Sequence, residues 1–177
     1  MASNATGTAF PRNSAVVAAA FVFIVGLATI LAAWAFQIIG GFIPCALCLE
    51  QRWPYYVGLP IAFVALASAL AKGPAWLTRL ALLLAALIFA YSTYLGVFHA
   101  GVEYAWWPGP PDCAVTTGPV TGTTGDLLDQ IDNIRVVSCT EASWRFPDGW
   151  GLSFAGWNAA VSLLLAVVAL AGAARKA

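Results

Sequence analysis

The stretch AVVAAAFVFIVGLATILAAWAF, residues 15–36, carries no charged side chain. A helix of this length, rising ~1.5 Å per residue, crosses the ~30 Å hydrocarbon core of a bilayer. Residues 53–71, 80–98 and 152–174 are uncharged in the same way. The whole chain is 61% hydrophobic and 9% charged, whereas soluble domains are ~25% charged. We therefore predict an all-α membrane protein, a four-transmembrane-helix bundle in which residues 1–177 form a single integral membrane domain.

The first apolar stretch has some features of a secretory signal peptide. Arg12 precedes it, and the small residues Ala32 and Ala33 lie near its end. Its apolar run is longer than the ~7–15 residues of a signal-peptide core. We therefore expect this stretch to remain as the first membrane helix.

The charged residues separate into two groups along the chain. One group is purely basic and lies in the N-terminal tail, the second connection and the C-terminal tail: Arg12, Lys72, Arg79, Arg175 and Lys176. The other group holds every acidic residue and three arginines, and it lies in residues 40–52 and 99–151. Because basic residues favour the cytoplasmic side, both termini should be cytoplasmic and these two loops should face outward.

The chain has four cysteines, and all of them fall in the two outer loops: Cys45, Cys48, Cys113 and Cys139. Disulfides persist on the outer side of a membrane, and an even number of cysteines is compatible with two pairs. Four cysteines allow three pairings, and their spacing does not choose among them.

The long outer loop, residues 99–151, is predicted to contain a short amphipathic helix. Thr124 can cap its start, and Leu127, Leu128, Ile131 and Ile134 recur at helical spacing. The segment is too short to cross a bilayer. It either lies on the membrane surface or packs against the other outer loop.

The sequence PCALCLEQR, residues 44–52, places a C-x-x-C unit at the edge of an apolar stretch. Pro44 favours the first turn of a helix, which would include Cys45. Arg52 follows Cys48 by four residues, so a continuing helix would place both side chains on the same face. A helix N-terminus and a nearby cation both stabilise a thiolate. A guanidinium at this depth can also hydrogen-bond a carbonyl oxygen of a quinone, or else extend to the interface or pair with Glu50.

Other uses of the cysteines fit less well. Covalent haem attachment needs a histidine directly after the second cysteine, where Leu49 stands. A four-cysteine zinc site usually has two short spacings, and Cys113 and Cys139 are far apart. We expect no metal. Two structural disulfides remain an alternative, although a C-x-x-C disulfide closes a small loop and so stabilises little.

Three segments together resemble the disulfide bond formation protein B (DsbB) family. They are PCALCLEQR, FHAGVE at residues 98–103 and GLSFAGWN at residues 151–158. The four-span layout and the second cysteine pair in a long outer loop are similar too. The resemblance implies a bacterial inner-membrane protein with cytoplasmic termini and periplasmic cysteine loops. It also implies a quinone-dependent oxidase that reoxidises a periplasmic thioredoxin-like (DsbA-like) disulfide oxidase.

The resemblance implies a role for each cysteine and for Arg52. Cys113 and Cys139 would form the disulfide attacked by the reduced partner. Cys45 and Cys48 would reoxidise that pair through an interloop mixed disulfide. Cys48 would pass the electrons to bound ubiquinone or menaquinone, either non-covalently or through a transient adduct, and Arg52 would bind the quinone.

Several further polar residues lie near the ends of the apolar stretches. His99, the only histidine, is expected to hydrogen-bond the quinone or to assist with its protons. Glu103 could support it from one turn further on. Gln37 and Asn158 are expected to form interhelical hydrogen bonds.

Two alternatives to the DsbB-like function remain. A vitamin K epoxide reductase-like enzyme also combines a C-x-x-C with a loop pair, but there the loop pair comes first in the sequence. A non-enzymatic membrane scaffold would use both cysteine pairs as structural disulfides. We expect a monomer with no nucleic-acid partner.

Overall fold

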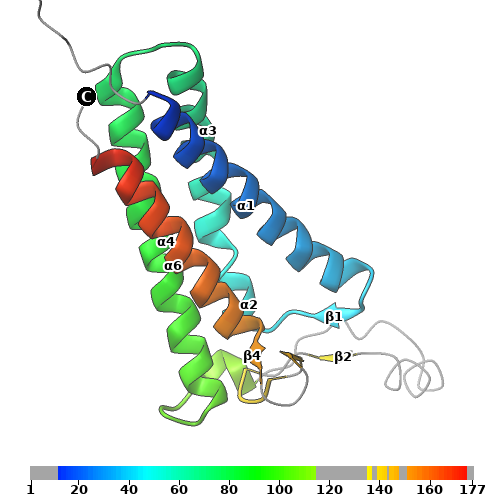
Figure 1. The fold of residues 1–177 in the computed structure, drawn as a ribbon. Coiled ribbons are helices and arrows are strands. Elements are labelled where there is room, and N and C mark those ends of the chain that lie inside the picture. The colour runs from blue at the N-terminus through cyan, green and yellow to red at the C-terminus, as the bar shows by residue number, and fades with distance from the viewer. Residues whose placement is uncertain (1–11, 115–134, 137–138, 143, 148–150, 175–177) are drawn as a thin grey trace, which may run out of the picture.

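The computed structural model describes residues 12–114, 135–136, 139–142, 144–147 and 151–174. Four long helices run along the bundle: α1 (Arg12–Ile38), α3 (Trp53–Leu70), α4 (Ala75–Glu103) and α6 (Phe154–Ala174) (Figure 1). A short helix, α2 (Ala46–Glu50), precedes α3 and forms one apolar stretch with it. Within the described part of the chain, four stretches are long and apolar enough to cross a membrane. The predicted four-transmembrane-helix bundle is confirmed.

Two of the helices, α1 and α4, extend beyond both ends of the predicted apolar stretches. Helix α4 includes Arg79 near its start and Glu103 at its end, whereas the uncharged run covers only residues 80–98. An uncharged run marks the hydrocarbon depth, and the helix continues into the headgroup region where ionised groups are solvated. Helix α6 begins later than predicted because Leu152 and Ser153 form a strand.

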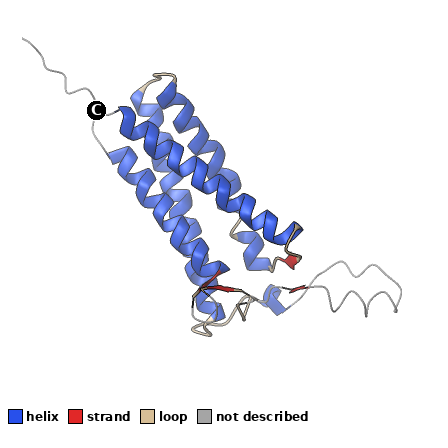
Figure 2. Cartoon of the chain, turned by 45° about the vertical axis from the view of Figure 1, so that its right-hand side comes forward, coloured by secondary structure: helices blue, strands red, loops and turns tan. Residues whose placement is uncertain are grey.

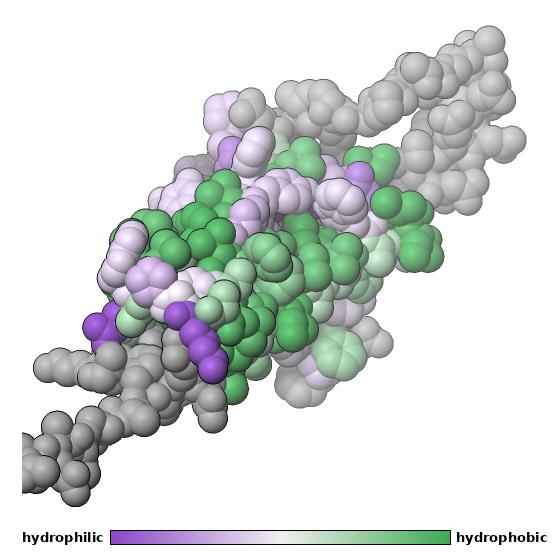
Figure 3. Space-filling model, turned by 90° about the horizontal axis from the view of Figure 1, so that it is seen from above, coloured by the Kyte–Doolittle hydropathy of each residue, from purple (hydrophilic) through white to green (hydrophobic). Residues whose placement is uncertain are grey.

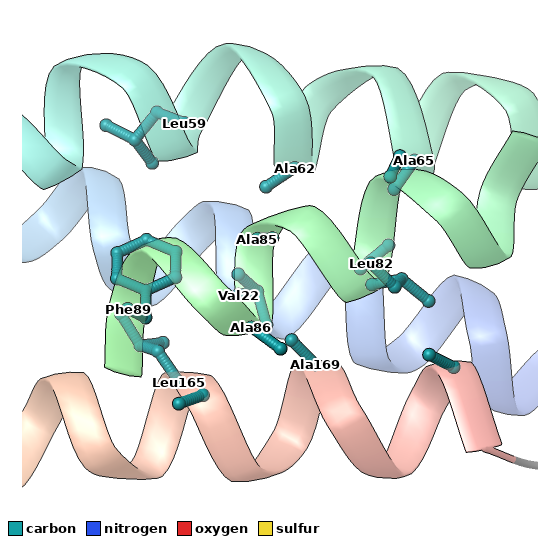
Figure 4. Packing of buried hydrophobic residues seen from close by; sticks show 14 of the residues in the cluster. Val22, Leu59, Ala62, Ala65, Leu82, Ala85, Ala86, Phe89, Leu165 and Ala169 are labelled. Atoms are coloured by element: carbon teal, nitrogen blue, oxygen red, sulfur yellow. The ribbon is translucent and has the colours of Figure 1, made fainter. Parts of the chain in front are cut away.

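Small residues allow the helices to approach closely. Helix α4 packs along α3 and α6, and α1 packs on α3 and α6. Buried alanines from all four helices surround a few larger side chains; those labelled in Figure 4 include Val22, Leu59, Leu82, Phe89 and Leu165. At Gly96, a Cβ atom would lie 2.7 Å from the backbone nitrogen of Ala159. The contact between α4 and α6 therefore requires glycine at this position, as is common between membrane helices.

The outward faces of the helices are apolar. Large hydrophobic side chains are exposed on every long helix; examples are Val17 at 65%, Val57 at 48%, Leu87 at 68% and Val167 at 55% exposed. Figure 3 shows apolar side chains over much of the face in view, with strongly hydrophilic ones in few places. Apolar surface of this extent suits contact with lipid.

One end of the bundle carries the short strands (Figure 2). Strand β1 (Phe42–Ile43) pairs in parallel with β2 (Arg135–Val136), and β3 (Arg145–Phe146) pairs antiparallel with β4 (Leu152–Ser153). The start of α1, the end of α6 and the α3–α4 turn lie at the opposite end (Figure 1). The β1–β2 pairing joins the two loops that contain the cysteines. The amphipathic helix expected from Thr124 lies outside the described residues.

Candidate thiol–disulfide site

The first cysteine pair lies at the start of α2. Cys45 is the N-cap residue, with an extended backbone (φ −73°, ψ 171°), and its sulfur accepts a hydrogen bond from the backbone N–H of Cys48 at 3.2 Å. The prediction that Cys45 lies within the first helical turn is therefore wrong by one position. An N-cap sulfur receives an otherwise unpaired helix N–H, and this donor favours a thiolate at Cys45.

The two sulfurs of this pair are free and 2.7 Å apart. A disulfide needs ~2.05 Å between sulfurs, so bond formation requires a movement of less than ~1 Å. The second pair, Cys113 and Cys139, is joined in a disulfide with Cα atoms 5.6 Å apart. Cys113 and Cys139 are thus bonded to each other, whereas the Cys45 and Cys48 sulfurs are in contact without a bond.

The two pairs meet in one small apolar cluster. The Cys45 and Cys139 sulfurs and a ring nitrogen of His99 all lie within 4.8 Å of one another. Leu47 and Val102 surround them. Cys139 is 1% exposed, whereas Cys113 is only half-buried. An external thiol therefore has easier access to Cys113 than to Cys139.

Local folding of the long loop brings its cysteines to this cluster. The pairing of β1 with β2 places the chain just before Cys139 beside the segment just before Cys45. After α4, the Trp107 ring folds back over Gly101, where a Cβ atom would overlap it, and donates its Nε1–H to the Phe98 carbonyl at 2.9 Å. A 3-10 turn, Pro111–Ala114, then presents Cys113.

His99 contacts the Cys45 sulfur from the end of α4. Its Nε2 lies 3.8 Å from the Cys45 sulfur, and its Nδ1 lies 3.0 Å from the side-chain nitrogen of Gln51. His99 is 1% exposed and Gln51 is 8% exposed. This places His99 against the cysteines, in a position fixed by a neighbouring amide.

The surroundings lower the pKa of Cys45. The hydrogen bond with the Cys48 side chain is the largest cause, and the His99 hydrogen bond acts in the same direction, while burial opposes both. Together they take the pKa of Cys45 from 9.0 to about 5. When this pair is reduced, Cys45 therefore carries the thiolate at neutral pH.

A cavity of about 530 Å³ lies beside Cys48, the member of the Cys45–Cys48 pair that does not face the sulfur cluster. Its walls come from α1, α2, the start of α3, α6 and Trp144. Cys48 and Arg52 both line it, and the other three cysteines do not. An aromatic group closes one part of the wall, with the rings of Trp144 and Phe154 stacked 4.7 Å apart.

The polar groups of the cavity are held by neighbouring helices. Arg52 donates from an NH1 nitrogen to the Gln37 side-chain oxygen at 2.6 Å. Tyr55 donates its hydroxyl to the Asn158 side-chain oxygen at 2.8 Å. The interhelical hydrogen bonds expected for Gln37 and Asn158 are therefore confirmed. The Asn158 amide nitrogen is buried and has no hydrogen-bond partner among the described residues.

The structure brings the six predicted site residues together in two groups. Cys45, Cys139, Cys113 and His99 form the sulfur cluster, whereas Cys48 and Arg52 face the cavity. His99 does not line this cavity and lies against the Cys45 sulfur, so its expected hydrogen bond to a quinone stays a prediction.

Glu103 and three further residues complete the surroundings of the two groups. Glu103 accepts a hydrogen bond from Ser153. Sequence reasoning gave no role to Gln51, Tyr55 or Trp144. Gln51 could have been predicted to form a hydrogen bond, because it is an uncharged polar residue at the start of an apolar stretch.

The fold and the site together define a multi-pass membrane protein with a dithiol and a disulfide in contact. The model of the disulfide bond formation protein DsbB family matches residues 15–172. The chain belongs to this family, which makes it an inner-membrane protein with a role in disulfide-bond formation. A search of curated proteins and a search of solved structures each found no match.

Proposed function

We propose that this protein is a quinone-dependent protein-disulfide oxidase. It takes two electrons from a reduced periplasmic thioredoxin-like (DsbA-like) oxidase and delivers them to ubiquinone or menaquinone. The observation that carries this proposal is the placement of the two pairs: Cys45 faces Cys139, while Cys48 lines a cavity that also contains Arg52. Both termini would be cytoplasmic, and the sulfur cluster would face the periplasm.

The first step is attack by a partner thiolate on Cys113. The S–S bond between Cys113 and Cys139 breaks, a mixed disulfide forms between the partner and Cys113, and Cys139 leaves as a thiolate. Cys113 is the attacked sulfur because it is the more exposed member of its pair. The released Cys139 thiolate then lies beside Cys45.

In the second step, Cys139 attacks Cys45 of the oxidised first pair. The Cys45–Cys48 bond breaks, an interloop Cys45–Cys139 disulfide forms, and Cys48 becomes a thiolate facing the cavity. The partner's second cysteine then attacks its own mixed disulfide, which releases the oxidised partner and a Cys113 thiolate. Cys113 recaptures Cys139, and Cys45 leaves as a thiolate. A leaving thiol with a low pKa leaves faster, and the His99 side chain and the Cys48 backbone N–H, which both lower the pKa of Cys45, stay in place when Cys48 is a thiolate.

The residues around the cavity fit a planar ring with two carbonyl oxygens. Arg52 offers charged N–H donors, and the Asn158 amide nitrogen is a donor without a partner among the described residues. Trp144 and Phe154 provide flat apolar surface. A quinone bound there would accept two electrons and two protons as Cys45 and Cys48 reform their disulfide. The overall reaction then converts a partner dithiol and a quinone into a partner disulfide and a quinol.

A quinone-reduction assay tests this proposal. Purified protein would be supplied with a reduced DsbA-like oxidase and either ubiquinone or menaquinone, and quinone absorbance would be followed. Each of the variants Cys45→Ser, Cys48→Ser, Cys113→Ser and Cys139→Ser should lose at least about 100-fold in turnover, because each removes a nucleophile or leaving group. The Thr78→Val variant, which removes a buried hydrogen bond to Ser68 at the opposite end of the bundle, is the matched control.

The assay also distinguishes the alternatives. A scaffold with two structural disulfides would show no quinone reduction in the unmodified protein. Quinone reduction that persists in Cys113→Ser with the protein partner as the only reductant would contradict the relay.

A further inference from the structure

The side-chain amide of Gln51 makes two contacts through the same nitrogen. This nitrogen lies 3.3 Å from the Leu95 carbonyl oxygen and 3.0 Å from the His99 Nδ1. A backbone carbonyl can only accept a hydrogen bond, so the group facing it must be the NH₂ and not the amide oxygen. Leu95 therefore fixes the orientation of the Gln51 amide.

That orientation in turn decides which nitrogen of His99 carries the proton. An NH₂ group pointing at Nδ1 needs an acceptor there, so Nδ1 must present its lone pair. The proton of the neutral ring then lies on Nε2, the nitrogen that faces the Cys45 sulfur at 3.8 Å. With the opposite amide orientation, the Gln51 oxygen would face the Leu95 carbonyl, and two acceptors would oppose each other.

We propose that Gln51 is a positioning residue that holds His99 in the Nε2–H tautomer, so that His99 donates a hydrogen bond to the Cys45 sulfur. The inference rests on the proposed function for its consequence in turnover, because it makes Cys45 a better leaving thiolate. The tautomer itself can be measured without turnover. Gln51 also lines the cavity, so its amide lies between the cavity and the sulfur cluster.

The hydrogen-bond donors and charged groups around Cys45 come from several elements. Helix α2 contributes Cys48, helix α4 contributes His99 and Glu103, and Arg145 of β3 faces Glu103. Cys139 does not titrate while it is in the disulfide. Among these groups, Cys48 and His99 hydrogen-bond the Cys45 sulfur directly. A change at Gln51 should therefore reach Cys45 through His99.

The tautomer can be read directly because the chain has one histidine. Protein labelled with ¹⁵N-histidine gives a single pair of ring-nitrogen signals, whose shifts report which nitrogen is protonated. In the quinone-free protein, we expect a protonated Nε2 and an unprotonated Nδ1. In Gln51→Glu the carboxylate can only accept, so Nδ1 should become protonated. In Gln51→Met, which keeps the side-chain length without a donor, the signals should report a mixture of tautomers.

A second readout follows the reactivity of Cys45. Alkylation of the reduced protein, mapped by peptide mass spectrometry, should show a higher pH midpoint for Cys45 in Gln51→Met than in the unmodified protein. Thr78→Val removes a buried hydrogen bond far from this site and should leave both readouts unchanged. A proton on Nδ1 in the unmodified protein, or an unchanged tautomer and midpoint in Gln51→Met, would overturn the inference. Neither result depends on whether the protein reduces a quinone.

Discussion

The Cys45 sulfur lies within 4.8 Å of the Cys139 sulfur, although the two cysteines come from different loops. Cys139 is 1% exposed, and its disulfide partner Cys113 is only half-buried. Cys45 and Cys139 therefore meet inside the cluster, whereas an outside thiol reaches Cys113 most easily. This arrangement gives each sulfur a separate task in a relay.

The first prediction concerns the interloop disulfide. In the double variant Cys48→Ser/Cys113→Ser only Cys45 and Cys139 remain, and we expect them to form a disulfide readily because their sulfurs are already close. Non-reducing peptide mass spectrometry of the purified variant would detect it.

The double variant Cys45→Ser/Cys113→Ser is the matched control for the interloop disulfide. It leaves Cys48 and Cys139, and Cys48 faces the cavity. It should form little intramolecular disulfide. Equal cross-linking in the two variants would show that the sulfur positions do not select the exchange partner.

The fold was largely predictable from the sequence, because hydrophobic length alone defines a membrane helix. The helix ends were less predictable. Arg79 and Glu103 lie inside α4, since a charged residue near a membrane interface does not interrupt helical hydrogen bonding.

The six site residues predicted from the sequence lie close together in the structure, but their division into two groups was not predictable. Cys48 and Arg52 share the cavity as expected, although α2 ends at Glu50 and Arg52 is the N-cap of α3, so the two do not lie on one continuous helix. The contact between His99 and Cys45 depends on the β1–β2 pairing and on the fold of the Trp107 turn, and both are long-range features. No local pattern encodes them.

The second prediction concerns the pH dependence of Cys45 reactivity. Because its pKa is lowered from 9.0 to about 5, Cys45 of the reduced protein should be thiolate throughout the neutral range. Its alkylation rate with iodoacetamide should be nearly constant above about pH 6 and fall as the pH drops through about 5.

The same shift has a consequence for the stability of the reduced protein. The folded-state pKa lies below the unfolded-state pKa, so ionisation of Cys45 favours the folded state. The contribution to stability is complete above pH 9.0, declines as the pH falls, and is lost as the pH falls through about 5.

In the alkylation experiment, a midpoint near pH 9.0 would contradict the proposed environment of Cys45.

The third prediction concerns Arg52, which Gln37 holds at the cavity with a 2.6 Å hydrogen bond. Arg52→Lys keeps the charge but loses the planar group that can bond Gln37 and a ligand together. A lost hydrogen bond to a charged group costs about 1.5–3 kcal/mol, so the KM for quinone should rise about 10- to 100-fold. Steady-state kinetics with varied quinone at saturating partner would measure it, and an unchanged KM would remove Arg52 from the quinone site.

The fourth prediction concerns the amide nitrogen of Asn158, which has no hydrogen-bond partner in the part of the chain that the structure describes. Asn158→Leu removes a neutral donor worth about 0.5–1.5 kcal/mol, and with it the acceptor of the Tyr55 hydroxyl, so quinone affinity should fall at least about 3-fold. Trp34→Phe is the control, since it deletes the Trp34–Tyr56 hydrogen bond of 3.1 Å on a side chain that does not line the cavity. Equal affinities for Asn158→Leu and the unmodified protein, in a direct quinone titration, would show that the cavity binds its ligand without this amide.

The last prediction concerns the packing of the helices and not the cysteine chemistry. At Gly96 a Cβ atom would lie 2.7 Å from the Ala159 backbone nitrogen, and a backbone cannot turn aside as a side chain can. Gly96→Ala should therefore push α4 away from α6 and destabilise the protein by about 1–3 kcal/mol, the usual cost of overpacking. At Gly26 the nearest atom is the end of the Leu59 side chain, at 3.0 Å, which can rotate, so Gly26→Ala should cost much less. Thermal unfolding in detergent, followed by circular dichroism, would rank the two variants, and a Gly26→Ala protein less stable than Gly96→Ala would contradict the close α4–α6 contact.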